Sequence, residues 1–236
     1  MKAAVFRGNG RIAAEDWPRP SIGAGELLLH LRGCGLCGSD IAKIVSPDTK
    51  APAVFGHELV GDVVEVGAGV RGIGRGDRVV AAHHVPCGEC HYCRRGSESM
   101  CRAFKESHLD PGGFAEFVRV PATNVAQATF ALPAHVSDEA ASFVEPLGCC
   151  LRATRRTGLQ PGDALPVALE TLYHRELTIT ATYSSSPADL AEAFRLVTTG
   201  ALKLDALYTH RLPLERLEEG VTLMRTARAL KVYVTP

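Results

Sequence analysis

The segment from Gly56 to Val79, which reads GHELVGDVVEVGAGVRGIGRGDRV, decides the fold. Its first part, Leu59 to Val66, is rich in valine and leucine and is typical of a buried β-strand. Glycines then punctuate residues 67–76, and residues 78–80 return to the strand pattern. A strand followed so closely by a turn and a second strand indicates an antiparallel arrangement.

The same segment contains a motif that could mislead. Gly67 to Gly72 read GAGVRG, which satisfies the G-x-G-x-x-G fingerprint of a phosphate-binding turn. Such a turn must open a helix whose N-terminus holds a pyrophosphate, whereas the next residues, IGRGDRVV, contain two more glycines and resume a strand pattern. We therefore expect no cofactor binding at this turn.

Further strands precede this segment, and helices follow it. Leu27, Leu29 and Leu31 share one face of GELLLHLRG, and no long helix interrupts the first 80 residues. Short strands without intervening helices predict a closed or partly open antiparallel barrel. Beyond Pro121 the pattern becomes helical, and Ser137 can cap a helix that runs through Val144.

The C-terminal part adds two helices and a strand. Ser186 followed by Pro187 and Asp189 is the signature of a capped helix start, and this helix is expected to end at Gly200. A second helix carries Leu217, Val221 and Met224 on one face, and KVYV at residues 231–234 reads as a strand. The predicted fold class is mainly β with flanking helices (α+β).

Composition excludes several classes of protein. The 236 residues contain 26 Lys and Arg against 26 Asp and Glu, so the chain lacks the positive charge of a nucleic-acid binder. No apolar run approaches the roughly 20 residues of a membrane span, and the first residues turn acidic before a signal-peptide core could form. We expect a soluble cytoplasmic protein with no nucleic-acid or membrane partner.

Cysteines form the strongest local signal. Cys87, Cys90, Cys93 and Cys101 lie within fifteen residues, where four thiolates can enclose a Zn²⁺ tetrahedrally and leave no position for chemistry. An iron-sulfur cluster is the main alternative, but the spacing departs from the ferredoxin pattern after the third cysteine. Four unrelated reduced cysteines are the remaining alternative.

A second set of possible ligands is dispersed along the chain. Cys37, His57, Glu58 and Glu145 offer a thiolate, an imidazole and carboxylates, a mixture that holds Zn²⁺ with one position open to water or substrate. Spacing alone favours this site only weakly. Most other histidines, among them His83 and His84, lack a ligand-like context and are expected in surface or core roles.

Several of these motifs, taken in order, resemble the zinc-dependent medium-chain alcohol dehydrogenase family. They are GCGLCGSD, GHELVGDVVEVGAGVRGIGRGDRV, the CGECHYC lobe and VEPLG, and the last is most similar to the sorbitol and threonine dehydrogenase branch. The resemblance covers residues 1–163 and resumes over 165–236. It implies a GroES-like barrel with a zinc lobe at about residues 84–104.

The resemblance also implies roles for residues. Cys37, His57 and Glu58 would be ligands of a catalytic zinc, and Glu145 an exchangeable or water-bridged fourth. Ser39 would begin a proton relay, although Ala42 stands where many members carry the next relay histidine. Cys87, Cys90, Cys93 and Cys101 would hold a structural zinc.

A larger departure is the missing coenzyme domain. Asp163 is followed at once by ALPVALETLYHRE, where family members place a dinucleotide-binding domain. We therefore expect a deletion at about residues 163–165, with 1–163 as the catalytic domain and 164–236 completing it. The chain should hold two Zn²⁺ and no NAD(P), act on a small alcohol or polyol, and be unable to transfer hydride alone.

Two other functions and one assembly mode remain open. A zinc-water hydrolase or lyase is conceivable because an open Zn²⁺ can activate water, and a metal-stabilised binding module without catalysis is the other possibility. Leu177 to Tyr183, LTITATY, forms an uncharged strand pattern that could pair between two copies in a homodimer. Pairing within the chain against Lys231 to Val234 is the alternative.

Overall fold

A computed structural model describes residues 1–157 and 181–236. The β-strands are β1 (Lys2–Gly8), β2 (Arg11–Asp16), β3 (Leu27–Gly35), β4 (Ala53–Val54), β5 (Glu58–Val66), β6 (Arg78–Ala81), β7 (Phe117–Val120), β8 (Thr129–Ala131), β9 (His210–Pro213) and β10 (Val232–Thr235). The α-helices are α1 (Gly38–Val45), α2 (Arg102–Glu106), α3 (Ala122–Ala128), α4 (Asp138–Ser142), α5 (Val144–Thr157), α7 (Pro187–Thr198) and α8 (Leu217–Arg225). Short 3-10 turns are η1 (Cys93–Arg95), η2 (Glu98–Met100), η3 (Asp205–Leu207) and η4 (Leu214–Arg216).

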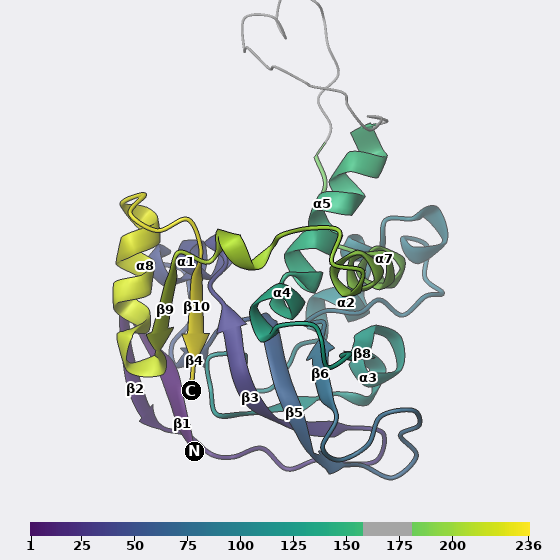
Figure 1. The fold of residues 1–236 in the computed structure, drawn as a ribbon, viewed down its shortest axis with the longest axis horizontal. Helices are drawn as coiled ribbons and strands as arrows, with labels where there is room; N and C mark the ends of the chain where they lie inside the picture. Colours follow the sequence, from purple (N-terminus) through teal and green to yellow (C-terminus); the bar gives the residue numbers. More distant parts are fainter. Residues whose placement is uncertain (158–180) are drawn as a thin grey trace, which may run out of the picture.

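Two sheets organise the described residues. The larger has the order β8-β6-β5-β3-β10-β9, with β7 also paired to β3, and the smaller has the order β2-β1-β4 (Figure 1). All pairs are antiparallel except β10 with β9, which run parallel. The mainly β fold with flanking helices is confirmed, and the described part contains no doubly wound parallel sheet.

The strand β3 joins the parts of the larger sheet. It pairs with β5 along most of its length, with β7 through Leu27 to His30, and with β10 through Cys34 and Gly35. Strand β3, which contains the strand predicted at residues 27–31, therefore lies between those predicted at 59–66 and 231–234. Strand β10 thus extends the sheet that contains β3 and lies beside the segment that carries Cys37.

The core consists of two main apolar clusters. The larger joins side chains of β1, β3, β5, β7 and β10 to the inner face of α8, where Leu217 and Val221 are buried as their spacing predicted. The smaller packs α4, α5 and α7 against β6, with Val80, Val144 and Leu190 among its members. The site described below lies beside the smaller cluster.

The glycine-rich turn after β5 opens no helix, as the sequence indicated. Residues 67–77 lead directly to β6, and the backbone N–H of Gly67 donates to the carbonyl of Glu26 at 2.8 Å. A Cβ at Gly67 would lie 2.0 Å from the carbonyl oxygen of Gly23, so this glycine is required by a close backbone approach.

One prediction about pairing is wrong, and others lie outside the described residues. Strand β10 has β3 on one edge and β9 on the other, so it offers no edge to the Leu177–Tyr183 segment. Residues 177–180 of that segment, and the junction at 163–165, lie outside the described ranges. The homodimer through this segment therefore stays a prediction.

Candidate metal centres

Cys37, His57 and Glu58 converge at the ends of two elements. Cys37 is the N-cap of α1, while His57 and Glu58 lie at the start of β5. One ligand atom from each of the three lies within 4.8 Å of the other two. The structure thus brings together three of the four residues predicted for this site, with a thiol, an imidazole and a carboxylate facing one point.

Asp40 orients this site and was not expected from the sequence. Its carboxylate accepts hydrogen bonds from the backbone N–H of Cys37 at 3.2 Å and of Gly56 at 3.3 Å. The same carboxylate lies 3.2 Å from Nδ1 of His57. An imidazole held by a carboxylate at Nδ1 presents Nε2, which is the usual arrangement of a metal-binding histidine.

The charges of Asp40 and His57 support each other. Burial works against the charge of Asp40, but attraction to His57 and hydrogen bonds to its carboxylate leave the pKa of Asp40 below its ordinary value. Burial also works against a charged His57, yet the carboxylate of Asp40 outweighs it and holds the pKa of His57 well above its usual range. This buried ion pair therefore holds the first turn of α1 against His57 without a bound metal.

Glu58 is fully buried and meets a cation from the other end of the chain. Its Oε1 accepts a hydrogen bond from Nζ of Lys231 at 2.7 Å, and its Oε2 lies 2.6 Å from the same nitrogen without hydrogen-bond geometry. Burial raises the pKa of Glu58, and the charge of Lys231 opposes that rise. A buried carboxylate oxygen without its own hydrogen bond is a fitting ligand for a cation.

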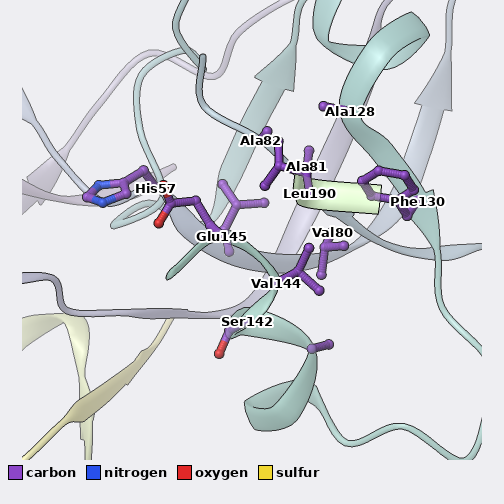
Figure 2. A pocket seen from close by; sticks show the side chains of 12 residues that line it. His57, Val80, Ala81, Ala82, Ala128, Phe130, Ser142, Val144, Glu145 and Leu190 are labelled. Carbon is purple, nitrogen blue, oxygen red and sulfur yellow. The ribbon is translucent and has the colours of Figure 1, made fainter. Parts of the chain in front are cut away.

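Glu145 and Ser39 line one cavity together with Cys37 and His57. The cavity has a volume of about 270 Å³, and its lining includes Cys37, Ser39, His57 and Glu145. The carboxylate of Glu145 points toward His57 (Figure 2), and the thiol of Cys149 donates to its Oε1 at 3.4 Å. Glu145 is not part of the group of three ligand atoms within 4.8 Å, so the structure does not bring this fourth predicted residue into the ligand set.

Ser39 is the second residue of α1. Its backbone N–H donates to Sγ of Cys37 at 3.5 Å, which orients the thiol toward the cavity. The helix that begins here also carries Lys43, whose side chain reaches the same cavity. The GCGLCGSD motif therefore supplies a ligand, its orienting carboxylate and Ser39 of the cavity wall.

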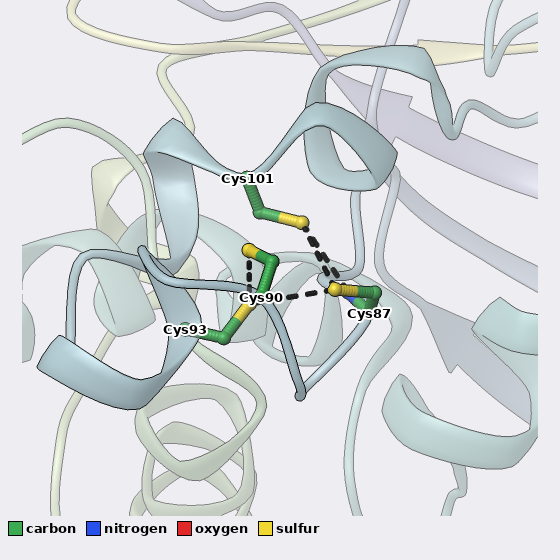
Figure 3. A group of neighbouring side chains, drawn as sticks. All are labelled: Cys87, Cys90, Cys93 and Cys101. Carbon is green, nitrogen blue, oxygen red and sulfur yellow. Dashed lines mark hydrogen bonds between the residues drawn. The ribbon is translucent and has the colours of Figure 1, made fainter.

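The four-cysteine lobe brings all its thiols together. The sulfurs of Cys87, Cys90, Cys93 and Cys101 lie within 4.8 Å of one another (Figure 3). Three pairs are 3.5, 3.5 and 3.9 Å apart. Four sulfurs about 2.3 Å from a tetrahedral zinc are about 3.8 Å apart, so the arrangement fits a closed zinc site.

One thiol of the lobe is prepared for metal binding. Burial would raise the pKa of Cys101, but hydrogen bonds from the backbone N–H groups of Cys87 and Phe104 lower it to about 6. The lobe is tied to α5 by Arg152, which donates to the carbonyl of Gly96 at 2.9 Å and pairs with Glu98 at 3.1 Å. A structural zinc site requires thiolate ligands and a backbone that is held in place. The lowered pKa of Cys101 and the contacts of Arg152 provide these two features.

Sequence reasoning missed four residues of the catalytic-type site. They are Asp40, His83, His84 and Lys231. Asp40 could have been found because it stands three residues after Cys37, where a helix N-cap exchanges hydrogen bonds with the N3 side chain. His83 and His84 line the cavity instead of taking the surface or core roles expected for them.

Known proteins place the chain in a family. The family model described as alcohol dehydrogenase GroES-like domain matches residues 23–134. Acryloyl-coenzyme A reductase from Metallosphaera sedula is 36% identical over 173 residues, which cover 71% of this chain and 51% of that protein. L-threonine 3-dehydrogenase from Alteromonas mediterranea is 38% identical over 172 residues, which cover 70% of this chain and 48% of that protein.

Solved structures agree on the fold. Galactitol-1-phosphate dehydrogenase from Escherichia coli superposes with a TM-score of 0.80 at 21% identity, covering 100% of both chains. An alcohol dehydrogenase from Thermus sp. ATN1 gives a TM-score of 0.76 at 21% identity, covering 100% of this chain and 99% of that one.

These matches support a zinc-type medium-chain dehydrogenase of the alcohol dehydrogenase family, with a GroES-like domain at residues 23–134. It spans about half the length of the curated relatives it matches. Among the helices of the described ranges, none has both the length and the apolar character needed to cross a membrane.

Proposed function

We propose that this chain is the zinc-bearing catalytic domain of an alcohol or polyol dehydrogenase that cannot transfer hydride by itself. The observation that carries the proposal is the convergence of Cys37, His57 and Glu58 beside a cavity of about 270 Å³. A mixed ligand set with an open side is the kind that serves catalysis, whereas four cysteines close a site.

The residues around the cavity have separate tasks. A Zn²⁺ bound by Cys37, His57 and Glu58 would polarise an alcohol oxygen and lower its pKa. Ser39 lines the cavity and is exposed, so it accepts the proton of the substrate hydroxyl while it releases its own hydroxyl proton to solvent. Asp40 keeps His57 and the N-cap residue Cys37 in position. Glu145 is the exchangeable or water-bridged fourth ligand.

Cys87, Cys90, Cys93 and Cys101 hold a second, structural Zn²⁺ in this proposal. Their sulfur spacing and the lowered pKa of Cys101 support it. The structural site should keep its metal longer than the other, because its four thiolates come from one short segment. The site at Cys37 draws its ligands from separate elements and faces an open cavity.

Residues 1–163 and 164–236 form one catalytic domain in this proposal, and the coenzyme domain is deleted at about 163–165. Pairing of β10 with β3 supports the first part. The second is supported by the length of the curated relatives, because the matched residues cover only about half of each. The substrate is a small alcohol or polyol, and NAD(P) would be bound only in full-length relatives.

Metal analysis with an absorption spectrum tests the metal assignment. We expect two Zn²⁺ per chain, no visible chromophore, and loss of one ion before the other on titration with a chelator. The Cys37→Ser variant should retain one ion, and the Cys150→Ser variant, which changes an exposed cysteine, should retain two. A stoichiometry of zero or one for the unmodified protein, or a brown iron-sulfur spectrum, would contradict the proposal.

Calorimetric titration with NAD(H) tests the deletion. The helix N-terminus and acidic residue that hold a dinucleotide belong to the domain proposed to be deleted, so binding should be absent or weak. Micromolar affinity would show that a dinucleotide site is present and that the deletion proposal is wrong.

A further inference from the structure

Arg152 is a buried cation on α5 that has no task in the proposed function. Its side chain is only 7% exposed, and a buried charge is costly unless acceptors surround it. It lies about two helical turns after Glu145, which lines the cavity at the start of the same helix. The acceptors around Arg152 come from two other segments, so this side chain connects α5 with both of them.

Two nitrogens of the guanidinium hold the four-cysteine lobe. Nη2 donates to the carbonyl oxygen of Gly96 at 2.9 Å, and Nη1 donates to Oε2 of Glu98 at 3.1 Å. Both acceptors lie between Cys93 and Cys101, in the stretch of chain that joins the third thiol of the lobe to the fourth. A metal ion bound by the thiols would fix the two ends of this stretch, and Arg152 fixes its middle.

The same guanidinium reaches the start of α7. Its Nη1 lies 3.6 Å from Oδ2 of Asp189, whose side chain is 5% exposed. That oxygen accepts hydrogen bonds from the backbone N–H and the hydroxyl of Ser186 at 3.0 and 2.7 Å, which close the first turn of the helix. Residues 183–185, immediately before this turn, line the cavity. Arg152 is thus connected to the cavity wall through one carboxylate.

The helix α5 and the start of α7 pack closely at Gly148. A Cβ at this glycine would lie 3.2 Å from Cβ of Ser185 and 3.2 Å from Cδ2 of Leu190. Gly148 stands in the turn that follows Glu145. Because packed side chains and rigid helices carry coupling between sites, a shift at the start of α7 is transmitted to the turn of α5 that carries Glu145.

This position uses the planar shape of arginine. Among the residues that the structure describes, Nε of Arg152 has no hydrogen-bond acceptor although it is buried, and an unpaired buried donor costs free energy. A lysine would bury no such nitrogen, but its single ammonium lacks the fork that contacts Gly96, Glu98 and Asp189 together. The side chain therefore serves the two neighbouring segments at a cost to its own hydrogen bonding.

We propose that Arg152 is a positioning residue that couples the four-cysteine lobe to the Cys37 site. When metal orders the lobe, the lobe holds Arg152, which holds the start of α7 against α5 and keeps Glu145 facing the cavity. The Cys37 site then binds its own ion more tightly, and linkage requires that metal at the Cys37 site strengthens the lobe by the same factor. This inference rests on the proposed function, because it takes both sites to bind zinc.

Competition with a chromophoric chelator, which measures the zinc affinity of each site, tests the coupling. Emptying the lobe with Cys93→Ser should weaken zinc binding at the Cys37 site by about 5-fold or more, as is typical of coupled sites. Arg152→Met should weaken the Cys37 site by a similar factor, and the double variant should be no weaker than either single variant. Additive losses in the double variant, or an unchanged Cys37 site in Cys93→Ser, would overturn the proposal.

Arg156→Met is the matched control. Arg156 donates to the same carbonyl of Gly96 at 2.9 Å from an exposed position on α5, but within the described residues it does not pair with Asp189. Its removal should leave the Cys37 site unchanged, and a loss as large as that of Arg152→Met would mean that anchoring of the lobe alone is responsible. Glu98→Ala is a milder variant at a partly exposed position, and it should weaken the Cys37 site while Arg152 keeps Asp189. An unchanged site in Glu98→Ala would also overturn the proposal.

Glu145→Ala distinguishes coupling from a general loss of structure. In this background, Arg152→Met and Cys93→Ser should have no further effect on the Cys37 site, because the residue through which the coupling acts is gone. A persistent effect would show that the fold has loosened generally and would refute the role of Arg152. Failure of the proposed function is separate, because it appears as zinc missing from the unmodified protein, whereas two zinc ions bound independently refute only this inference.

Discussion

Asp40 illustrates how one buried carboxylate can organise a site. It caps the first turn of α1 by accepting from the N–H of Cys37, and it also binds His57 and the N–H of Gly56. The positions of two ligands from separate segments, Cys37 and His57, are thus fixed relative to each other without a bound metal. Residues that orient ligands in this way contribute strongly to the metal affinity of a site.

Replacing Asp40 with asparagine should weaken zinc binding at the Cys37 site by about 10- to 100-fold. The amide keeps the size of the side chain but removes the charge that holds His57. Competition with a chromophoric chelator measures the two sites separately, and the four-cysteine site should be unchanged. Asp48→Asn, at an exposed position, is the control, and equal affinities in the two variants would contradict the role given to Asp40.

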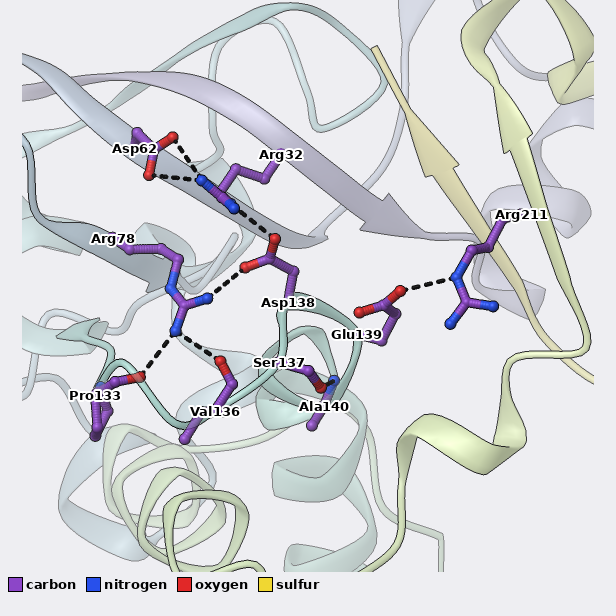
Figure 4. A network of polar contacts seen from close by, with 10 residues as sticks. All are labelled: Arg32, Asp62, Arg78, Pro133, Val136, Ser137, Asp138, Glu139, Ala140 and Arg211. Carbon is purple, nitrogen blue, oxygen red and sulfur yellow. Dashed lines mark hydrogen bonds and ion pairs between the residues drawn. The ribbon is translucent and has the colours of Figure 1, made fainter.

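At the scale of elements, α4 and α5 show why a single predicted helix became two. Pro146 is the third residue of α5 and has no N–H to donate to the carbonyl of Ser142, so the ladder is broken there. Ion pairs then fix α4 to the strands, since Asp138 binds Arg32 and Arg78, and Glu139 binds Arg211 (Figure 4). The break directs Glu145 to the cavity.

The four-cysteine lobe has little secondary structure, so metal should maintain its order. Replacing Cys93 with serine should remove the structural zinc and expose the lobe to trypsin at Arg94 or Arg95, both already on the surface. Mass spectrometry of limited digests measures this. Cys150→Ser should digest like the unmodified protein, and a Cys93→Ser lobe that resists trypsin would mean that packing alone orders it.

The helix α7 begins with the predicted capping box, in which Ser186 and Asp189 exchange hydrogen bonds. Asp189 is buried and also pairs with Arg155. Burial acts to raise its pKa, but the hydrogen bonds from Ser186 and the charges of Arg155 and Arg152 bring the pKa below its ordinary value.

This lowered pKa predicts a pH-dependent contribution to stability. The folded pKa is below the unfolded value, so stabilisation is full above the unfolded pKa of about 3.9 and is lost as the pH falls through the folded pKa. Asp189→Asn should therefore lower the free energy of unfolding at about pH 7 and have a smaller effect at about pH 3. Urea unfolding at both values measures it, with the exposed Asp205→Asn as control; a pH-independent difference would refute the charge effect.

At the scale of the whole molecule, Lys231 and Glu58 connect the two ends of the chain. They are 173 residues apart in sequence, and the pairing of β10 with β3 brings them together. A buried carboxylate that loses its ion-pair partner is strongly destabilising. Glu58 therefore depends on the C-terminal segment as long as no metal compensates its charge.

Lys231→Met should cost about 3–5 kcal/mol in the metal-free protein, the usual effect of leaving one buried charge unpaired. Zinc loading should reduce this loss, because the ion would then compensate the charge of Glu58. Thermal unfolding with and without zinc measures both values. Lys2→Met, which removes an exposed pair with Asp16, should change neither, and equal losses with and without zinc would mean that Glu58 does not face the metal.

The sequence by itself determined the features that depend on local spacing. Alternation and valine content located β3 and β5, the Ser186 capping box located α7, and the Cys87–Cys101 spacing located a four-thiol lobe. Each of these signals lies within a short run of consecutive residues, so it can be read without the tertiary structure. The family resemblance, rather than spacing, united Cys37 with His57 and Glu58.

Only the tertiary structure decided the contacts between distant segments. It paired β10 with β3 and β9, set Lys231 on Glu58, and placed His83 and His84 on the wall of the cavity. None of these has a local signature, because a cavity wall is formed by residues from several segments, and a buried charge depends on a partner from elsewhere in the chain. Such contacts exist only after the sheet has brought separate segments together, so no pattern of neighbouring residues encodes them.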